Sequence, residues 1–268
     1  MENATIITTF MAKKGRPDYS EGIVINFEKG IVLIKNLRVV KKQYQNIILL
    51  SHMGSRSSVL SHILGSHAEV AGYYEQHQRH TDPFYEIKIK ANLLQDNSLS
   101  YQHRYLYDKV LHERFDPQTL EAYKVVVLIR KPPSALKSIM SMGGITNSLW
   151  QEDPYRAFAY YCQRLQRIID IVEKNNIDFC FVEADDLVEK TDDVLNEIST
   201  FLELDSPLSS HCKSFDKTGD AIYGDPSDNI KSGTIVKTKN HTKVMIPDEL
   251  LAIAQHYYDR CQKLCSKK

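Results

Sequence analysis

The fold of this chain can be inferred from one segment, Ser51-His52-Met53-Gly54-Ser55-Arg56-Ser57-Ser58. It follows an apolar run at 47–50 and leads directly into 59–64, where apolar residues recur at helical spacing. A strand, a turn rich in glycine and serine and then a helix form a phosphate cradle, because the amides and dipole at a helix N-terminus favour an anion. The serine hydroxyls and Arg56 add donors. An ordinary capped helix after a buried strand would show the same pattern.

A second strand–turn–helix segment, at 125–138, resolves this ambiguity. Apolar residues at 125–129 end in Arg130, and a turn with two prolines then leads into a predicted helix. Arg130 therefore stands at the carboxyl end of a strand, where open α/β sheets bind their ligands. Ser138 lies eight residues after Arg130, about one to two turns into the helix, so both side chains can face the same anion.

With both segments in place, the chain resembles the sulfotransferases that use 3′-phosphoadenosine 5′-phosphosulfate (PAPS), in particular bacterial enzymes with small-molecule acceptors. In that family a first loop, R-S-G-S/T-T/S, holds the 5′-phosphosulfate. A second, R-D-P with serine eight residues after the arginine, holds the 3′-phosphate. Arg130, Pro132 and Ser138 match this second loop. Further likenesses follow in family order within 45–240, at 67–77, Tyr107-Asp108-Lys109, 182–187, 201–204 and Ile230-Lys231-Ser232-Gly233.

The first loop departs from the family pattern. Its glycine and its basic residue have exchanged places, giving Gly54-Ser55-Arg56 where the family has arginine first. Position 56 thereby loses the backbone freedom of glycine, and Arg56 points either to the phosphosulfate or to the acceptor. A second departure is Ala184, where the family often has a tyrosine before the acidic pair, here Asp185-Asp186. That position supplies no aromatic contact to adenine.

The alternation of apolar runs and amphipathic segments predicts an α/β fold for residues 45–268. With the resemblance, it indicates a P-loop-like three-layer domain in which helices flank a central, mostly parallel sheet. The predicted strands lie at 47–51, 69–73, 124–130 and 177–182. The predicted helices lie at 57–66, 132–142, 154–174, 191–203 and 247–264. Between 74 and 122 we expect helical or irregular segments.

Residues 1–44 read as a separate, β-rich N-terminal extension. Apolar runs at 22–27 and 31–34 flank a turn at 28–30, which predicts a β-hairpin. None of the family's motifs falls in this part of the chain. Its candidate roles are an extra edge ribbon, a contact in a homodimer, or a wall of the acceptor pocket.

The composition excludes several classes of partner. Lys and Arg number 34, and so do Asp and Glu, so no overall field favours nucleic acid or an anionic membrane. An anionic co-substrate must then be bound by local charge. The five cysteines are an odd number without a C-x-x-C pair, which argues against a disulfide framework and a zinc site. With no signal peptide and no apolar run of about 18 residues, we expect a cytoplasmic protein.

The resemblance implies a set of nucleotide-binding residues. The 5′-phosphate would lie on the amides of the first loop, with Arg56 or Lys109 near the bridging oxygen. Arg130 and Ser138 would bind the 3′-phosphate. No metal is required. The residues implied for the PAPS or PAP site are Gly54, Ser55, Arg56, Ser57, Ser58, Arg130, Ser138 and a late loop of Lys231, Ser232 and Gly233.

The candidate general base is Glu75, with His77 as the second choice. Both follow a predicted strand, and the family delivers an acidic residue or a histidine from this position. Lys109 is either a catalytic cation or a surface lysine at a strand end. Asp185 and Asp186 are expected to cap the helix that starts near residue 187 rather than to take part in catalysis.

The resemblance implies a sulfotransferase acting on a hydroxyl or amine of a small polar metabolite, in natural-product tailoring and so in secondary metabolism. Loops near 76–104, 143–153 and 206–230 would shape the acceptor pocket, and they are rich in Tyr, His and Asp. A P-loop kinase is an alternative, although the signature G-x-x-x-x-G-K-[ST] is absent. A non-catalytic nucleotide-binding protein is another, because of the exchanged first loop.

Overall fold

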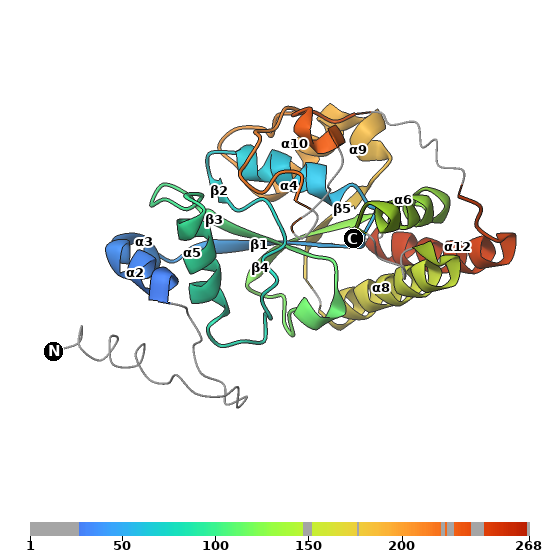
Figure 1. Ribbon diagram of the computed structural model, residues 1–268, viewed down its shortest axis with the longest axis horizontal. Coiled ribbons are helices and arrows are strands. Elements are labelled where there is room, and N and C mark those ends of the chain that lie inside the picture. The colour runs from blue at the N-terminus through green and yellow to red at the C-terminus, as the bar shows by residue number, and fades with distance from the viewer. Residues whose placement is uncertain are drawn as a thin grey trace.

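Five parallel strands form a single sheet in the order β2-β3-β1-β4-β5 (Figure 1). This is a computed structural model, and it describes residues 27–146, 152–175, 177–220, 223, 228–236 and 244–266. The strands are β1 (Gln45–Ser51), β2 (Val70–Ala71), β3 (Tyr105–Val110), β4 (Tyr123–Ile129) and β5 (Phe179–Glu183). The predicted α/β domain with a parallel sheet is confirmed.

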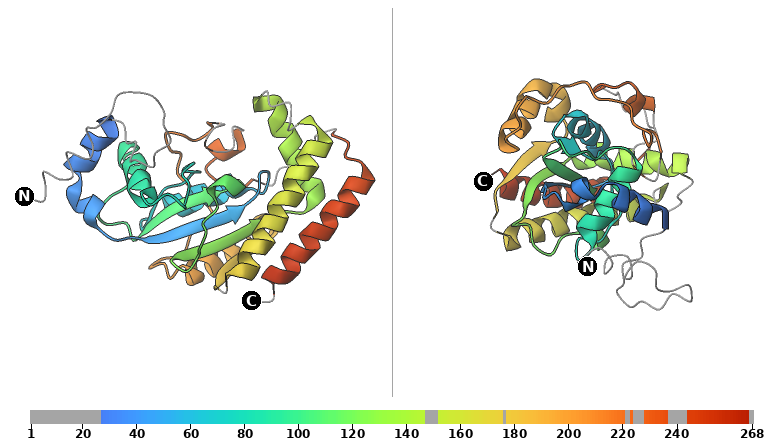
Figure 2. Two further views of the ribbon diagram at one scale, coloured as in Figure 1. Left: turned by 90° about the horizontal axis from the view of Figure 1, so that it is seen from below. Right: turned by 90° about the vertical axis from the view of Figure 1, so that its left-hand side faces the viewer.

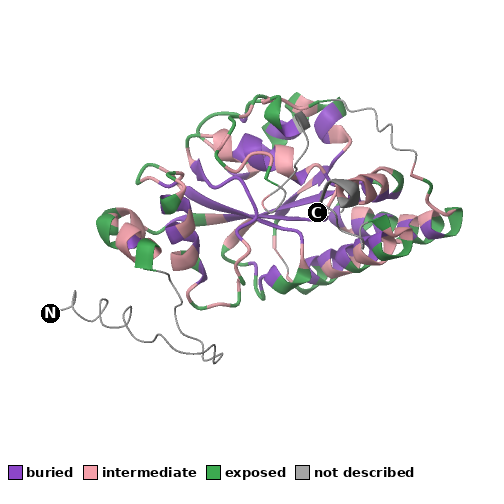
Figure 3. Ribbon diagram, viewed as in Figure 1, coloured by how far each residue is buried: buried purple, intermediate pink, exposed green. Residues whose placement is uncertain are grey.

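Two helical layers cover the sheet. Ile48 and Leu50 of β1 pack into one of them, and Ile47 and Leu49 pack into the other, because successive side chains on a strand point to opposite faces. The first layer consists of α6 (Pro132–Thr146), α8 (Pro154–Lys174) and α12 (Asp248–Cys265). The second consists of α4 (Ser57–Ser66), α9 (Asp186–Glu189) and α10 (Thr191–Phe201). In Figure 3 the strands are almost entirely buried, and the helices are exposed along their outer sides.

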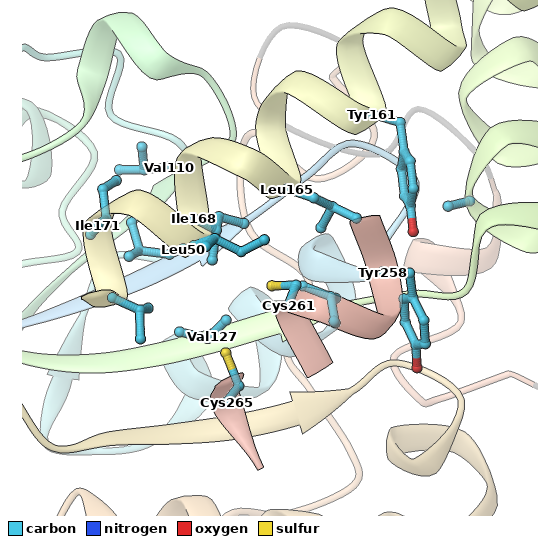
Figure 4. Close-up of a cluster of buried hydrophobic side chains, with 14 of the residues drawn as sticks. Leu50, Val110, Val127, Tyr161, Leu165, Ile168, Ile171, Tyr258, Cys261 and Cys265 are labelled. Atoms are coloured by element: carbon cyan, nitrogen blue, oxygen red, sulfur yellow. The ribbon is translucent and has the colours of Figure 1, made fainter. Parts of the chain in front are cut away.

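Helix α8 is the longest element of the first layer. Its N-cap, Asp153, accepts hydrogen bonds from the amides of Tyr155 and Arg156, and Pro154 follows at the first helical position. One face of the helix is apolar, and it packs between the sheet and α12. Figure 4 shows this contact, in which the labelled side chains are Leu50, Val110, Val127, Tyr161, Leu165, Ile168, Ile171, Tyr258, Cys261 and Cys265.

The predicted N-terminal hairpin is wrong in the part that the structure describes. Residues 31–34 belong to helix α2 (Phe27–Lys35), and α3 (Leu37–Lys41) follows; the first predicted strand lies outside the described residues except for Phe27. Helix α2 packs on α5 (Tyr85–Gln95), where Lys29 Nζ donates to Asn92 Oδ1 at 2.6 Å. This packing overrides the strand preference of the β-branched residues. Figure 2 shows α2 and α3 at the end of the domain opposite to α12.

Strand β3 lies where we expected helical or irregular structure. It pairs with β1 over the whole of Tyr105–Val110 and with β2 at its start. Asp108 and Lys109 interrupt its apolar pattern, yet both are buried, at 3% and 1% exposure. Sequence periodicity misses such a strand because it takes charged residues for exposed ones. The short elements η1 (Glu113–Phe115) and α11 (Asp228–Lys231) complete the described fold.

Arg164 of α8 binds the carboxyl edge of the sheet. Its Nε donates to the carbonyl of Ser51 at 2.8 Å, and its Nη2 donates to the carbonyl of Val110 at 2.9 Å. Its Nη1 lies 2.7 Å from Oδ1 of the buried Asp116. One guanidinium therefore satisfies the last carbonyls of β1 and β3 and is itself neutralised.

Replacing Arg164 should destabilise the domain much more than replacing Arg167, which binds the same carboxylate from the surface at 3.0 Å. Arg164→Met leaves two carbonyls unpaired and Asp116 with a single partner, so we expect the free energy of unfolding to fall by about 3–5 kcal/mol. Arg167→Met breaks a half-exposed pair and should cost at most about 1 kcal/mol. Urea denaturation of both variants measures the difference. Equal losses would show that the strand ends do not depend on Arg164.

Candidate active site

The two loops that follow β1 and β4 diverge to opposite faces of the sheet. The strands are parallel neighbours, with Ser51 beside Leu128. Helix α4, which follows β1, packs on one face, and α6, which follows β4, packs on the other. A crevice at the carboxyl ends of two strands whose connections diverge in this way is where open α/β sheets bind ligands. Both predicted phosphate-binding segments begin there.

The two segments are in direct contact. Gly54 has φ +75°, and a Cβ on it would lie 2.8 Å from the carbonyl oxygen of Ala135 and 3.1 Å from Cβ of Ser138. Only glycine lets α6 approach the first loop this closely. Arg130 Nη1 donates to the Gly54 carbonyl at 3.0 Å. The structure therefore brings Gly54, Arg130 and Ser138 together, and their role toward a nucleotide remains a prediction.

Arg56 and Arg130 converge on a single carboxylate. Nη2 of Arg56 and Nε of Arg130 each lie 3.7 Å from Oδ1 of Asp185. Within the described residues, the buried Nη1 of Arg56 and Nε of Arg130 have no hydrogen-bond acceptor. Burial, followed by the charge of Arg56, lowers the pKa of Arg130 to about 10. Both arginines are cationic at neutral pH, because a guanidinium group stays protonated in proteins. The pair therefore has hydrogen-bond donors that the protein leaves unsatisfied, and an anion can accept from them.

The capping role expected of Asp185 is wrong. Asp185 occupies the N-cap position of α9, but its side chain makes no cap hydrogen bond and faces the arginines instead. Its own amide donates to Oε2 of Glu183 at 3.0 Å. Burial, and then the charge of Asp185, raises the pKa of Glu183. Asp186 pairs with Lys190 at 3.1 Å on the surface of the same short helix.

Two serine hydroxyls in the first-loop segment bond within the protein. Ser51 Oγ donates to the Leu128 carbonyl at 2.6 Å, so Ser55 Oγ donates to Ser51 Oγ at 2.7 Å. The Ser55 hydroxyl is therefore used inside the protein. Ser57 and Ser58 open α4, whose N-cap residue Arg56 makes no side-chain cap bond. The first amides of α4 have no acceptor within the helix, as at any helix N-terminus.

The candidate base lies in the interior, at the end of β3. Glu75 is 5% exposed, and its Oε1 has no hydrogen-bond donor within the described residues and lies 4.0 Å from Nδ1 of His77. Burial raises the pKa of Glu75, while the charges of Lys109 and His77 and the amide of Leu111 oppose that shift. Lys109 is buried, with Nζ 3.5 Å from the Tyr223 carbonyl, so its interpretation as a surface lysine is wrong.

Tyr160 of α8 connects this wall to the first loop. Its hydroxyl accepts from the amide of Met53 at 3.0 Å and donates to the carbonyl of Leu111 at 2.9 Å. Since Leu111 also donates to Glu75, the base and the first loop are fixed to one another through three polar contacts. The structure thus brings Glu75, His77 and Lys109 to the same edge of the sheet as Gly54.

The late loop is held by a different part of the chain. The amide of Cys212 donates to the carbonyl of Gly233 at 2.8 Å, and Gly219 lies against the side chain of Lys231. The segment around Thr218 in turn contacts α4 through His62 Nε2 at 3.0 Å. Lys231, Ser232 and Gly233 therefore lie beside the 211–219 segment. Their contact with the nucleotide remains a prediction.

His52 is a residue that the sequence did not distinguish from the other histidines. It follows β1 directly and is completely buried. Its Nε2 accepts from the amide of Arg130 at 3.0 Å, and its Nδ1 donates to the carbonyl of Met53 at 2.8 Å. Tyr160 and Arg164 were missed as well, and Asp185 was expected only to cap a helix. A polar residue on the buried face of a predicted helix was the available signal for Tyr160 and Arg164.

Two kinds of feature are absent from the described residues. Groups of three or more His, Cys, Asp or Glu side chains arranged to hold a metal ion are not found in this part of the chain. Its helices also do not combine the length and the apolar composition that crossing a bilayer requires.

Two solved sulfotransferase domains share this fold. The sulfotransferase domain from the Synechococcus PCC 7002 olefin synthase aligns over 81% of this chain and 98% of its own length, with a TM-score of 0.50 and 17% sequence identity. The sulfotransferase domain from the curacin biosynthetic pathway aligns over 81% and 99%, with a TM-score of 0.52 and 18% identity. No family model and no curated protein matches the chain. The P-loop-like sulfotransferase fold implied by the resemblance is confirmed.

Position 56 offers a test of how the exchanged loop is accommodated. Arg56 has φ 68°, in the left-handed region. Arg56→Gly and Arg56→Ala both remove the guanidinium, but only alanine must hold a side chain at this φ. We expect the free energy of unfolding of Arg56→Gly to exceed that of Arg56→Ala by about 0.5–1 kcal/mol. The left-handed backbone costs a side chain about 1–2 kcal/mol, which outweighs the extra entropy that glycine gives the unfolded chain. Urea denaturation decides; an alanine variant of equal or greater stability contradicts this.

Proposed function

We propose that this chain is a sulfotransferase that transfers the sulfuryl group of PAPS to a hydroxyl or amine of a small polar metabolite, as a tailoring step in natural-product synthesis. The observation that supports it most directly is a pair of guanidinium groups at the carboxyl edge of the sheet, that of Arg130, which is buried, and that of Arg56, whose side chain is 17% exposed. Both are cationic and both have unsatisfied buried donors. A buried cation without a full set of acceptors is costly unless an anion binds it.

The site divides naturally between two phosphates. The first amides of α4 and the side chain of Arg56 would bind the 5′-phosphosulfate. Arg130, held against Gly54, and Ser138, packed beside the same glycine, would bind the 3′-phosphate. Asp185 lies between the two arginines at 3.7 Å from each, longer than a hydrogen bond. At each arginine, an oxygen of its own phosphate group can approach the donor more closely than this carboxylate does, so the nucleotide would displace it.

Glu75 is the proposed base. Its Oε1, which has no hydrogen-bond donor among the described residues, would take the proton from the acceptor as the acceptor atom attacks sulfur and the bond to the bridging oxygen breaks. A pKa raised by burial suits this task, because a carboxylate of ordinary pKa is a weak base. Charge then accumulates on the leaving phosphate, where Arg56 or Lys109 would stabilise it.

The proposal is tested first by the binding of PAP. Without added metal, PAP should raise the melting temperature by several degrees. Arg130→Ala should weaken PAP binding by about 2–4 kcal/mol, because a buried charge-assisted contact to the 3′-phosphate is lost. Adenosine 5′-phosphosulfate lacks that phosphate, so the wild type and Arg130→Ala should bind it alike in calorimetry.

Asp185→Asn is the matched variant in the same cluster. It keeps the shape of the side chain but removes the competing negative charge, so it should bind PAP several-fold more tightly than the wild type. Weaker binding would show that Asp185 helps to hold the nucleotide. Equal responses to ATP and PAP, with a need for magnesium, would favour the kinase. Binding of PAP without sulfate transfer to any acceptor would favour a non-catalytic nucleotide-binding protein.

Glu75→Gln separates catalysis from binding. The substitution preserves size and hydrogen-bonding capacity, so PAP affinity should be nearly unchanged while turnover falls by about 10²–10⁴-fold. In the wild type, turnover should fall on the acid side with an apparent pKa above the usual range for glutamate, because Glu75 must be ionised to accept the proton. If Glu75→Gln stays active while His77→Ala does not, His77 is the base.

A further inference from the structure

His52 lies at the point where the two phosphate-binding loops separate. It is the first residue after β1, and it has no exposed surface. The loop of β1 leaves toward α4 and that of β4 leaves toward α6, so the two backbones diverge from this point, although α6 packs on Gly54 further along the first loop. At the point of divergence itself, the backbones of the two loops are linked by the side chain of His52.

The imidazole makes that link with a defined tautomer. The amide of Arg130 can only donate, so Nε2 of His52, 3.0 Å away, must be the unprotonated acceptor. The proton is then on Nδ1, which donates to the carbonyl of Met53 at 2.8 Å. One neutral ring therefore joins the backbone of the first loop to the backbone of the second.

Arg130, at the start of the second loop, is held at both its amide and its carbonyl. While His52 accepts from the amide of Arg130, the Tyr161 hydroxyl donates to the Arg130 carbonyl at 2.8 Å. The Tyr161 ring also packs edge-on against His52, with the ring centroids 4.9 Å apart. The Arg130 guanidinium then reaches Gly54 in the first loop. The separation of the two loops depends on this arrangement.

We infer that His52 is a positioning residue which fixes the distance between the two phosphate-binding loops, so that both phosphates of one nucleotide can be bound together. This rests on the proposed function. Two sites that bind one ligand lose affinity when the distance between them varies, because binding must then fix that distance, which costs conformational entropy.

The environment keeps the ring neutral. Burial lowers the pKa of His52 to about 4, the bond to Met53 opposes that shift, and the charges of Arg130 and Arg164 add to it. Those two arginines and the Tyr161 hydroxyl are the ionisable groups that face it in these contacts. Protonation would place an N–H group on Nε2 of His52, facing the Arg130 amide, which is also a donor, so this hydrogen bond would be lost. The stability contributed by neutral His52 is thus complete above its unfolded pKa of about 6.5 and is lost as the pH falls through about 4.

Two substitutions of His52 separate its two hydrogen bonds. In His52→Gln, the side-chain oxygen reaches the place of Nε2 and can still accept from the Arg130 amide. In His52→Asn, the shorter side chain reaches only the place of Nδ1 and keeps the bond within the first loop. We expect His52→Asn to bind PAP about tenfold or more weakly, the order of one lost buried hydrogen bond, and His52→Gln to remain within about threefold of wild type.

Binding of adenosine 5′-phosphosulfate distinguishes a positioning role of His52 from a merely structural one. It engages the first loop without the 3′-phosphate, so both variants should bind it within about threefold of wild type. Equal losses for PAP and for this ligand, or a glutamine variant as weak as the asparagine variant, overturn the inference. Retained PAP affinity in His52→Asn overturns it as well.

Hydrogen exchange without ligand keeps this test independent of the proposed function. The Arg130 amide should exchange faster in His52→Asn than in His52→Gln. If it does and the wild type binds no PAP, the proposed function fails while the link between the loops stands. If neither variant folds, NMR titration of His52 in the wild type decides the matter: an Nε2-protonated ring, or a pKa near 6.5, overturns the inference.

Discussion

The buried carboxyl edge of the sheet is the constraint on which the rest of this structure depends. Parallel strands that end inside a protein leave backbone groups without strand partners, and each unsatisfied group costs about 1–3 kcal/mol. Helix α8 supplies the partners. Arg164 binds the last carbonyls of β1 and β3, Tyr160 binds Met53 and Leu111, and Tyr161 binds the carbonyl of Arg130. The same contacts that stabilise the strand ends therefore fix the loops of the candidate site.

This arrangement also explains how a chain with no net charge can present a cationic site. The excess charge is local, because Arg56, Arg130 and Lys109 meet at one edge, and acidic residues neutralise it unequally. Asp116 binds Arg164 at 2.7 Å, which completes a structural pair. Asp185 is shared by Arg56 and Arg130 at 3.7 Å, which leaves donors unsatisfied. A tight ion pair therefore marks Arg164 as a structural cation, and a loose one distinguishes Arg56 and Arg130, the cations of the proposed binding site.

The parts of the fold that the sequence predicted are those with a local pattern. Strands β1 and β4 and helices α4 and α8 were found close to their true bounds, because apolar runs and amphipathic spacing reflect burial directly.

What could not be predicted depends on contacts between distant residues. Strand β3 was missed because Asp108 is buried, and only the partners Gln76, His80 and Tyr85 make that burial possible. None of those contacts is visible in a local window. Helix α2 was mistaken for a strand because its packing on α5 outweighs the preference of its β-branched residues. The role of Asp185 depends on the meeting of two arginines that are 74 positions apart in the sequence (130 − 56).

The exchanged first loop shows how one glycine is placed when two positions favour it. Both Gly54 and Arg56 have positive φ, at 75° and 68°. At position 54 any side chain would also collide with the Ala135 carbonyl at 2.8 Å, a backbone atom that cannot move without shifting α6. At position 56 a side chain costs only the left-handed conformation, about 1–2 kcal/mol. Glycine therefore stands where its absence would be most disruptive, and the strained position carries an arginine whose guanidinium faces the proposed phosphate site.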